Sequence, residues 1–374
     1  MFHFKTHFQK IVRNQMHCVW SPRCLYISAV TILIITVVLW CILPYNYSNI
    51  MTTTHCDTNT RSQEKYLLFP MFTIISGSGL GNQLFEIFSL LGMAQKLNRT
   101  AIFNKRDWFL NFRLKTVHKK IPKIAEQVVT MDIEPSKTMR FINPPACCEY
   151  SLPPILSCEQ SQFLVVDGRF FQSYKYFSSM ESTIREWLTP DDEVRQYLGT
   201  MIKQEDMKRH KICVHIRRGD FVTDGQHAGT EKEFTKNAID FFNEQKWVRK
   251  EIVSQSKYQN EIRIMPTPQD QPFKDLHFSQ VYCDTVLITA PSSTFGWWIG
   301  YLSKNQKNVY YRDIRDVEDS VKYQMIDDDF YPRSWRKMGM THPRSYLDPS
   351  TLPSAQLQYT HLSLLIVIQT LIAR

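Results

Sequence analysis

The chain has 374 residues, 43% of them hydrophobic and 13% aromatic, which is enough for one large or two medium domains and excludes general disorder. Its formal net charge of +9 favours an anionic partner: a phosphorylated ligand, a membrane surface or a nucleic acid. The basic residues are dispersed without a long Lys/Arg run, which argues against nucleic-acid binding.

The first predicted element is a membrane-spanning helix at residues 25–43, which contain no charged residue. At a rise of about 1.5 Å per residue, such a run crosses a hydrocarbon core of about 30 Å. Four basic residues precede it, whereas the next one after it is Arg61, so the positive-inside rule predicts a cytosolic tail at residues 1–24. A cleaved signal peptide is the alternative, but its apolar region would be shorter and would end in small residues.

Residues 44–66 are polar, rich in Thr, Asn and Ser, and without periodicity, so they predict a stem. Two sequons for N-glycosylation follow the predicted span. The one at Asn46 abuts the membrane. The one at Asn98, in Asn98-Arg99-Thr100, lies between a predicted helix and a predicted strand and is the preferred glycosylation site.

Six cysteines follow the predicted span and would face an oxidising compartment, where disulfides persist. The stretch "PPACCEYSLPPILSC" predicts a disulfide-tied loop, although six cysteines allow fifteen pairings and the sequence does not choose among them. A zinc site is the alternative, but the chain has no CxxC pair with a matching set of histidines.

Strands alternate with helices from about residue 67 onwards. In the first half, "YLLFPMFTIIS" and "FLVVDG" predict strands and "LFEIFSLLGMAQKL" predicts a helix with apolar residues at three-to-four spacing. In the second half, "KICVHIR" and "DTVLITA" predict strands, and "EKEFTKNAIDFF" and "TFGWWIGYLS" predict helices. This alternation indicates an α/β fold with a mostly parallel sheet.

A polar, helical stretch at residues 188–210 separates the two halves. We therefore expect domains at residues 67–195 and 196–345, followed by a tail at residues 346–374. The apolar stretch "HLSLLIVIQTLIAR" within that tail predicts a packed helix or strand without an assigned function.

The loop "SGSGLGNQLF" at residues 76–85 is the first candidate for ligand binding. Its glycines let the backbone approach a ligand, and the helix after it offers free N–H groups to a phosphate. Its G-x-G-x-G spacing differs from the G-x-G-x-x-G dinucleotide fingerprint, which argues against a nucleotide-dependent oxidoreductase. A tight strand-to-helix turn without a ligand is the simpler interpretation of the glycines.

The stretch "KICVHIRRGD" at residues 211–220 is the second candidate. Arg217, Arg218 and Asp220 fall at the carboxyl end of its predicted strand, the edge at which open α/β sheets bind ligands. Two adjacent guanidinium groups suit the oxygens of a diphosphate. A structural Arg–Asp ion pair and an exposed Arg-Gly-Asp adhesion motif are the alternatives.

The stretch "APSSTFGWW" is the third candidate. Ser292, Ser293 and Thr294 precede or open a predicted helix, where hydroxyl groups cap free amides and the helix end attracts a phosphate. A capped core helix is the alternative, and for Trp297 and Trp298 packing is the preferred interpretation.

Four stretches, "GLGNQLF" (79–85), "DGRFFQSYKYF" (167–177), "HIRRGD" (215–220) and "SSTFGWW" (292–298), stand in the order typical of one family. Over residues 74–311 the chain resembles the α-1,2-fucosyltransferases of glycosyltransferase family 11, and the predicted anchor resembles the type II topology of their animal Golgi members. The resemblance implies a GT-B architecture of two Rossmann-like domains.

The resemblance also implies a reaction. The donor would be GDP-β-L-fucose, the acceptor a galactoside on a glycan, and the transfer inverting and independent of a metal. Arg218 and Asp220 would be catalytic. The implied donor-binding residues are Asn82, His215, Arg217, Arg218, Ser292, Ser293 and Thr294. The general base is left open among Asp220, Asp224 and Glu231. A glycan- or GDP-binding membrane protein without turnover is the rival hypothesis.

The chain departs from the family's pattern at one place. Family members usually have a further strand after the helix that follows H-x-R-R-G-D, but here "AIDFF" meets "NEQKWVRK" directly. Either residues 239–242 serve as that strand, or a sheet element is missing and the donor site is impaired.

Overall fold

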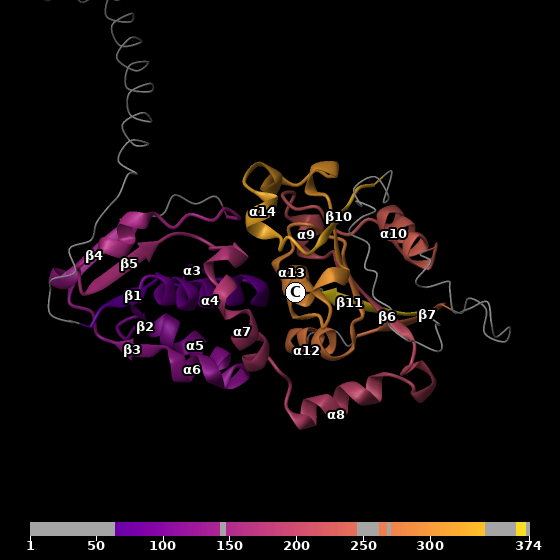
Figure 1. The fold of residues 1–374 in the computed structure, drawn as a ribbon, viewed down its shortest axis with the longest axis horizontal. Helices are drawn as coiled ribbons and strands as arrows, with labels where there is room; N and C mark the ends of the chain where they lie inside the picture. The colour runs from indigo at the N-terminus through magenta and orange to yellow at the C-terminus, as the bar shows by residue number, and fades with distance from the viewer. Residues whose placement is uncertain (1–63, 143–146, 245–261, 268–270, 341–363, 372–374) are drawn as a thin grey trace, which may run out of the picture. The chain divides into compact units, whose positions relative to one another are not determined.

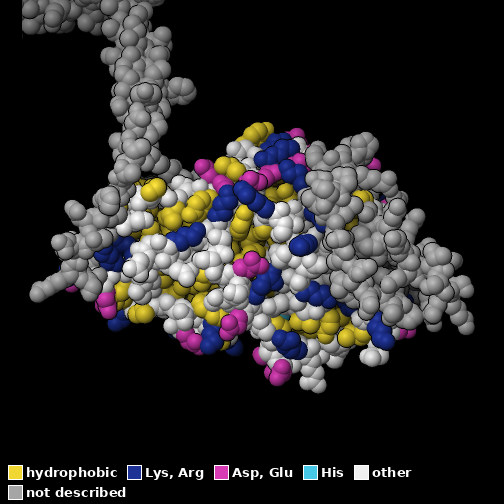
Figure 2. Space-filling model, in the orientation of Figure 1, with side chains coloured by type: hydrophobic (Ala, Val, Ile, Leu, Met, Phe, Trp, Pro, Cys, Tyr) yellow, Lys and Arg dark blue, Asp and Glu magenta, His cyan; other side chains and the backbone are white. Residues whose placement is uncertain are grey.

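The structure is a computed structural model that describes residues 64–142, 147–244, 262–267, 271–340 and 364–371, all within one compact unit of residues 60–374 (Figure 1). The predicted span at residues 25–43 and nearly all of the predicted stem lie outside the described residues. Among the described residues, no helix has the length and apolar character needed to cross a membrane. On the face drawn in Figure 2, Lys and Arg side chains are scattered among acidic and apolar ones.

Two sheets organise the described residues. The first has the strand order β3-β2-β1-β5-β4 and the second the order β10-β9-β8-β6-β11-β7. Every strand pair within them is parallel. The strands of the first sheet are β1 (Tyr66–Leu68), β2 (Thr100–Asn104), β3 (Val129–Met131), β4 (Thr138–Ile142) and β5 (Phe163–Asp167). Those of the second are β6 (His210–Arg217), β7 (Ile262–Pro266), β8 (Thr285–Ile288), β9 (Val309–Arg312), β10 (Arg336–Met338) and β11 (Leu364–Leu371).

Helices connect the strands, as parallel pairing requires. Those of the first half are α3 (Phe72–Ile75), α4 (Leu80–Lys96), α5 (Trp108–Lys120), α6 (Pro122–Gln127) and α7 (Glu181–Trp187). Those of the second are α8 (Asp192–Met201), α9 (Asp220–Thr223), α10 (Lys232–Glu244), α12 (Pro272–Tyr282), α13 (Thr294–Leu302) and α14 (Asp327–Phe330). The predicted mixed α/β class with mostly parallel sheets is thus confirmed. This mixed α/β architecture is consistent with a Rossmann-like glycosyltransferase.

The central strand β6 is buried on both faces, as an interior parallel strand must be. Ile212 and Val214 belong to one core cluster, whereas Cys213 belongs to another on the opposite face. The alternation predicted from the sequence is therefore confirmed. Phe234 and Phe242 of α10 cover the first of these faces.

The sequence analysis found no strand directly after the helix that is now α10. The strand beside β6 instead comes from the predicted tail. Residues 239–242 are helical within α10, so their interpretation as a strand is wrong. Instead β11 lies between β6 and β7 and pairs with β6 along its whole length, from Leu364 beside His210 to Leu371 beside Arg217. The sheet has no gap beside β6, so the sequence-based reason to expect an impaired donor site is removed.

The two halves share one hydrophobic core. Helix α4 packs against α13, and side chains around almost its entire circumference are buried because β1 and β2 cover one side and α13 another (Figure 1). Trp297 and Trp298 are fully buried, and the ring of Phe85 lies 4.6 Å and 5.4 Å from theirs. The prediction that these tryptophans pack in the core is confirmed.

Disulfides join Cys147 to its neighbour Cys148 and Cys213 of β6 to Cys283 after α12, and Cys158 is also disulfide-bonded. The predicted loop "PPACCEYSLPPILSC" is therefore tied by disulfides. It contains a bond between adjacent residues that the sequence analysis did not anticipate.

Candidate functional site

The two predicted arginines at the end of β6 have different environments. Arg217 is only 7% exposed, and its Nη2 lies 2.5 Å from Oδ2 of Asp220. Its guanidinium also stands over the ring of Phe221, at 4.8 Å from the ring centre. Burial lowers the pKa of Arg217, and the charge of Asp220 opposes that effect. Asp220 therefore neutralises the charge of Arg217, while Nε and Nη1 of this guanidinium are buried without a hydrogen-bond partner among the described residues.

Arg218 is exposed and carries an unneutralised charge. Gly219, with a positive φ of 53°, turns the chain away immediately after it. Nη1 of Arg218 donates to the carbonyl oxygen of Thr230 at 2.9 Å, which holds the guanidinium in place without neutralising it. No carboxylate among the described residues forms an ion pair with it. Of the two predicted guanidinium groups, Arg218 is the one available to an anion.

The hydroxyl groups before α13 are all occupied. Ser292 donates to Oδ2 of Asp319 at 2.6 Å, and Ser293 caps the helix by accepting from the N–H of Gly296. The backbone N–H groups of Thr294 and Phe295, the first two in the helix, donate to no residue that the structure describes. A ligand at this helix end would therefore meet backbone donors and the positive end of the helix dipole more readily than the serine side chains.

His215 lies beneath α13. It is fully buried, and a Cβ built on Gly296 would lie 2.6 Å from its Nδ1, so the imidazole fills the space that this glycine leaves. Its Nε2 lies 3.4 Å from Oγ of Ser293. Burial lowers the pKa of His215 to about 3, and Arg217 adds to that effect, so the ring is neutral at physiological pH. This geometry supports a role in seating α13.

Asn82 meets α13 from the other half of the molecule. Its Oδ1 accepts from Oγ1 of Thr294 at 2.7 Å and from Nε2 of Gln172 at 3.0 Å. The neighbouring Gly81 allows this approach, because its carbonyl oxygen accepts from Nε1 of Trp298 and a Cβ there would lie 2.6 Å from the backbone of α13. The sequence-predicted Asn82 and Thr294 are thus brought into direct contact.

The three carboxylates considered as general bases each contact a basic side chain. Asp220 pairs with Arg217, Asp224 with His227 at 2.6 Å, and Glu231 with Arg312 at 2.8 Å. Burial raises the pKa of Asp224, but hydrogen bonds from Gln226 and His227 outweigh it and lower the pKa overall.

The comparison with known families decides the chain's membership. The family model described as "Glycosyl transferase family 11" matches residues 37–337, most of the chain. The chain belongs to glycosyltransferase family 11. The resemblance found in the four sequence motifs is therefore confirmed.

Two relatives from Caenorhabditis elegans, both named "Galactoside 2-alpha-L-fucosyltransferase", support the same membership. The first is 48% identical over 336 residues, which cover 86% of this chain and 95% of the relative. The second is 35% identical over 314 residues, which cover 74% of this chain and 78% of the relative.

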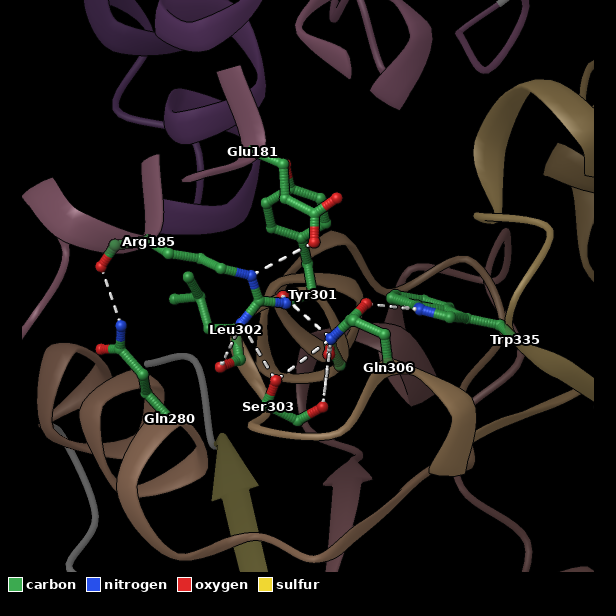
Figure 3. A network of polar contacts seen from close by, with 9 residues as sticks. Glu181, Arg185, Gln280, Tyr301, Leu302, Ser303, Gln306 and Trp335 are labelled. Atoms are coloured by element: carbon green, nitrogen blue, oxygen red, sulfur yellow. Dashed lines mark hydrogen bonds and ion pairs between the residues drawn. The ribbon is translucent and has the colours of Figure 1, made fainter. Parts of the chain in front are cut away.

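The far end of α13 in this family 11 chain is held by Arg185 of α7 (Figure 3). Its guanidinium donates to the carbonyl oxygens of Tyr301, Leu302 and Ser303, the acceptors that a helix leaves unsatisfied at its carboxyl end. Gln306 reinforces this end, and Trp335 in turn donates to Gln306. Because Arg185 fixes one end of α13 and Asn82 the other, the helix that presents the candidate site is immobilised along its length.

Asn98, the predicted glycosylation site, is exposed directly after α4, with a φ of 50°. Its exposure is compatible with modification, which stays a prediction. Among the described residues, no group of three or more His, Cys, Asp or Glu side chains has metal-binding geometry.

Gln172 and Asp319 are the site residues that sequence reasoning missed. Gln172 lies within the "FFQSYKYF" motif, which signalled the family but carried no predicted role. Asp319 accepts from Ser292 and from the N–H of Ala228, and no motif surrounds it.

Proposed function

We propose that this chain transfers L-fucose from GDP-β-L-fucose to the 2-hydroxyl group of a galactoside on a glycan. Membership of glycosyltransferase family 11 and the names of the two relatives support this activity. One observation carries the site assignment. Arg218 presents an unpaired guanidinium at the carboxyl edge of the second sheet, the edge at which α13 also begins.

The chemistry explains why such a group is needed. As the bond between fucose and phosphate breaks, negative charge grows on the leaving GDP while the sugar becomes oxocarbenium-like. Arg218 would stabilise that negative charge by bidentate hydrogen bonding, because a planar guanidinium matches two phosphate oxygens. The amides at the start of α13 would add a positive dipole end. With protein cations in this role, the proposed reaction needs no metal.

Asn82 would contact the nucleotide sugar from the first half. Arg217 would act indirectly: its ion pair with Asp220 holds the turn at Gly219, which aims Arg218. Within the donor site we thus assign a direct contact to Arg218, Asn82 and the backbone of Thr294, and supporting contacts to His215, Arg217, Ser292 and Ser293.

Inversion at the fucose carbon requires a base for the acceptor hydroxyl. Asp220, Asp224 and Glu231 are the candidates. The general base can be identified from pH–rate profiles of three variants: Asp220→Asn, Asp224→Asn and Glu231→Gln. The variant that lacks the base should lose the acidic limb of its profile.

We further propose a GT-B arrangement, with an acceptor domain at residues 67–195 and a donor domain at residues 196–345 completed by β11. The predicted span at residues 25–43 would anchor the chain in the Golgi membrane as a type II protein. Protease protection in sealed microsomes tests this topology. Digestion of the catalytic part from the cytosolic side would refute it.

The activity is tested with the full-length chain in detergent, GDP-fucose and a β-galactoside acceptor. The expected product is cleaved by an α-1,2-specific fucosidase. A folded chain that binds GDP but transfers no fucose to any galactoside would replace this proposal with a binding protein without turnover.

A further inference from the structure

Gln172 lies between Asn82 and Cys148, one half of the Cys147–Cys148 disulfide. Gln172 is only 7% exposed, and its Nε2 donates to Oδ1 of Asn82 at 3.0 Å. Its Oε1 lies 3.5 Å from Sγ of Cys148. Because a disulfide sulfur carries no hydrogen, that contact is not a hydrogen bond. The Gln172 carboxamide is therefore held through its Nε2 end alone.

The backbone around Gln172 is fixed on both sides. Its N–H donates to the carbonyl oxygen of Cys147 at 2.9 Å, and the next residue, Ser173, donates from Oγ to the carbonyl oxygen of Asp329 at 2.6 Å. The two residues before it, Phe170 and Phe171, have φ values of 70° and 46°. Two consecutive side-chain-bearing residues in the left-handed region are strained, and such strain persists where the surrounding structure enforces it.

The strained turn separates two phenylalanines that follow each other in sequence. Phe171 is buried and stacks on Phe69, with ring centres 4.2 Å apart. Phe170 instead stands edge-on to Phe72. This turn places the carboxamide of Gln172 within hydrogen-bonding distance of Asn82, a residue ninety positions earlier in the chain.

The two contacts to Asn82 are not equivalent. The hydroxyl group of Thr294 can donate or accept, so it fits either end of the Asn82 carboxamide. A carboxamide has one end that only donates and one that only accepts, so Gln172 and Asn82 must match: Nε2 opposite Oδ1, or Oε1 opposite Nδ2. In the structure Nε2 faces Oδ1, and Nδ2 of Asn82 forms no hydrogen bond with any described residue.

We propose that Gln172 is a positioning residue for the transfer reaction: it holds the Asn82 carboxamide so that Nδ2 faces the substrates. This inference rests on the proposed function, in which Asn82 contacts the nucleotide sugar. A nucleotide sugar offers phosphate oxygens, which accept hydrogen bonds, so an outward N–H₂ group is complementary and an outward carbonyl oxygen is repulsive. In the arrangement that the structure shows, Gln172 thereby presents the donor end of Asn82 without touching the ligand.

A pair of substitutions separates positioning from packing. Gln172→Glu keeps the shape, but the carboxylate that it introduces can only accept when ionised, which turns Nδ2 of Asn82 inwards and its Oδ1 towards the phosphates. When protonated, the same carboxyl group donates to Oδ1 and restores the original arrangement. Gln172→Met keeps the volume and removes both hydrogen-bonding ends. Gln324→Leu, at an exposed glutamine, is the control.

Near pH 7.5 we expect Gln172→Glu to lower kcat/KM for GDP-fucose roughly tenfold to a hundredfold, the loss typical of a buried polar group left mismatched. On acidification the activity of this variant relative to the wild type should recover as the introduced carboxyl group becomes protonated. The charged groups on the neighbouring segments are Arg169, the Lys175–Asp329 pair at 2.5 Å, and Glu86 of α4, whose pKa burial raises to about 7. All four are present in both proteins, so their titration cancels in the ratio of variant to wild-type activity. Gln172→Met should lose activity by a factor that does not change with pH.

A double-mutant cycle covers the case in which Gln172→Glu does not fold. If Gln172 acts through Asn82, the losses caused by Gln172→Met and Asn82→Ala should not add in the double variant. Additive losses, or equal losses in the Gln172→Glu and Gln172→Met variants at every pH, would overturn the proposal. Wild-type chain that neither binds GDP nor transfers fucose would refute the proposed function itself, and this inference with it.

Discussion

At the start of α4, the same glycine-to-alanine substitution should have opposite effects at Gly79, the N-cap, and at Gly81, in the first turn. A Cβ added at Gly81 would lie 2.6 Å from the backbone nitrogen of Phe295 and 2.7 Å from Oγ1 of Thr294, whereas a Cβ at Gly79 meets nothing within 4 Å. Gly79 has a φ of −55°, which alanine adopts without strain. Gly81→Ala should therefore push α4 away from α13, and Gly79→Ala should not.

The size of the effect follows from the contacts. Carbon side-chain atoms do not approach closer than 3.0 Å, so α4 and α13 must separate by about 0.4 Å at this point. Overpacking of this kind costs about 1–3 kcal/mol. The hydrogen bonds from Trp298 to Gly81 and from Thr294 to Asn82 cross the same contact, and weakening them adds about 1 kcal/mol.

The free energy of unfolding of Gly81→Ala should thus fall by about 2–4 kcal/mol, or Tm by about 5–10 °C for a domain of this size. Gly79→Ala should change it by less than about 1 kcal/mol. Thermal unfolding of the purified full-length variants is the measurement, with KM for GDP-fucose as a second readout that should rise only in Gly81→Ala. Equal stability and equal KM in the two variants would refute the packing argument.

Three further predictions test other parts of the structure. Arg218→Ala should lower kcat about a hundredfold, with partial retention in Arg218→Lys, because an ammonium lacks the bidentate fork; the exposed Arg333→Ala is the control, and an equal effect on both would contradict the assignment. Arg185→Ala should lower the free energy of unfolding by about 2–3 kcal/mol, since it leaves the carbonyl oxygen of Leu302 without a donor and those of Tyr301 and Ser303 with Gln306 alone; an unchanged Tm would show that Gln306 is sufficient to cap the helix. Burial raises the pKa of Glu86 to about 7, so the folded chain retains a proton that the unfolded chain releases near pH 4.5, and this group makes stability fall as pH rises from about 4.5 to about 7. Glu86→Gln should flatten that slope in urea unfolding measured at pH 5 and pH 7.5, and parallel slopes in the two proteins would exclude the effect.

Local patterns predicted the elements that carry the site. The three-to-four spacing of α4 and the alternation of β6 are properties of short windows, and both were predicted correctly. The Asn82–Thr294 contact was not accessible in this way, because it joins residues more than two hundred positions apart. The role of Gln172 was missed for the same reason.

Arg217 and Arg218 show how much of the site the alternation of strand faces along β6 can predict. Arg217 shares a strand face with Cys213 and His215, and both of these are fully buried, so a buried Arg217 in need of a partner follows from the pattern. That Asp220 supplies this partner, and leaves Arg218 unpaired, depends on the turn at Gly219. Of the expected pair of guanidinium groups, Arg217 is thus engaged by Asp220 and Arg218 is not, and phosphate binding by either stays a prediction.

The insertion of β11 between β6 and β7 constrains how the second sheet can form. Strand β6 emerges from the ribosome about 150 residues before the partner that fills the space beside it. Until residue 371 has been synthesised, β6 and β7 each expose an edge with unsatisfied N–H and C=O groups, the condition under which strands recruit foreign partners. Closure of this half is a late event for the nascent chain, and a frameshift or early stop that spares every catalytic motif would still leave an open, aggregation-prone sheet.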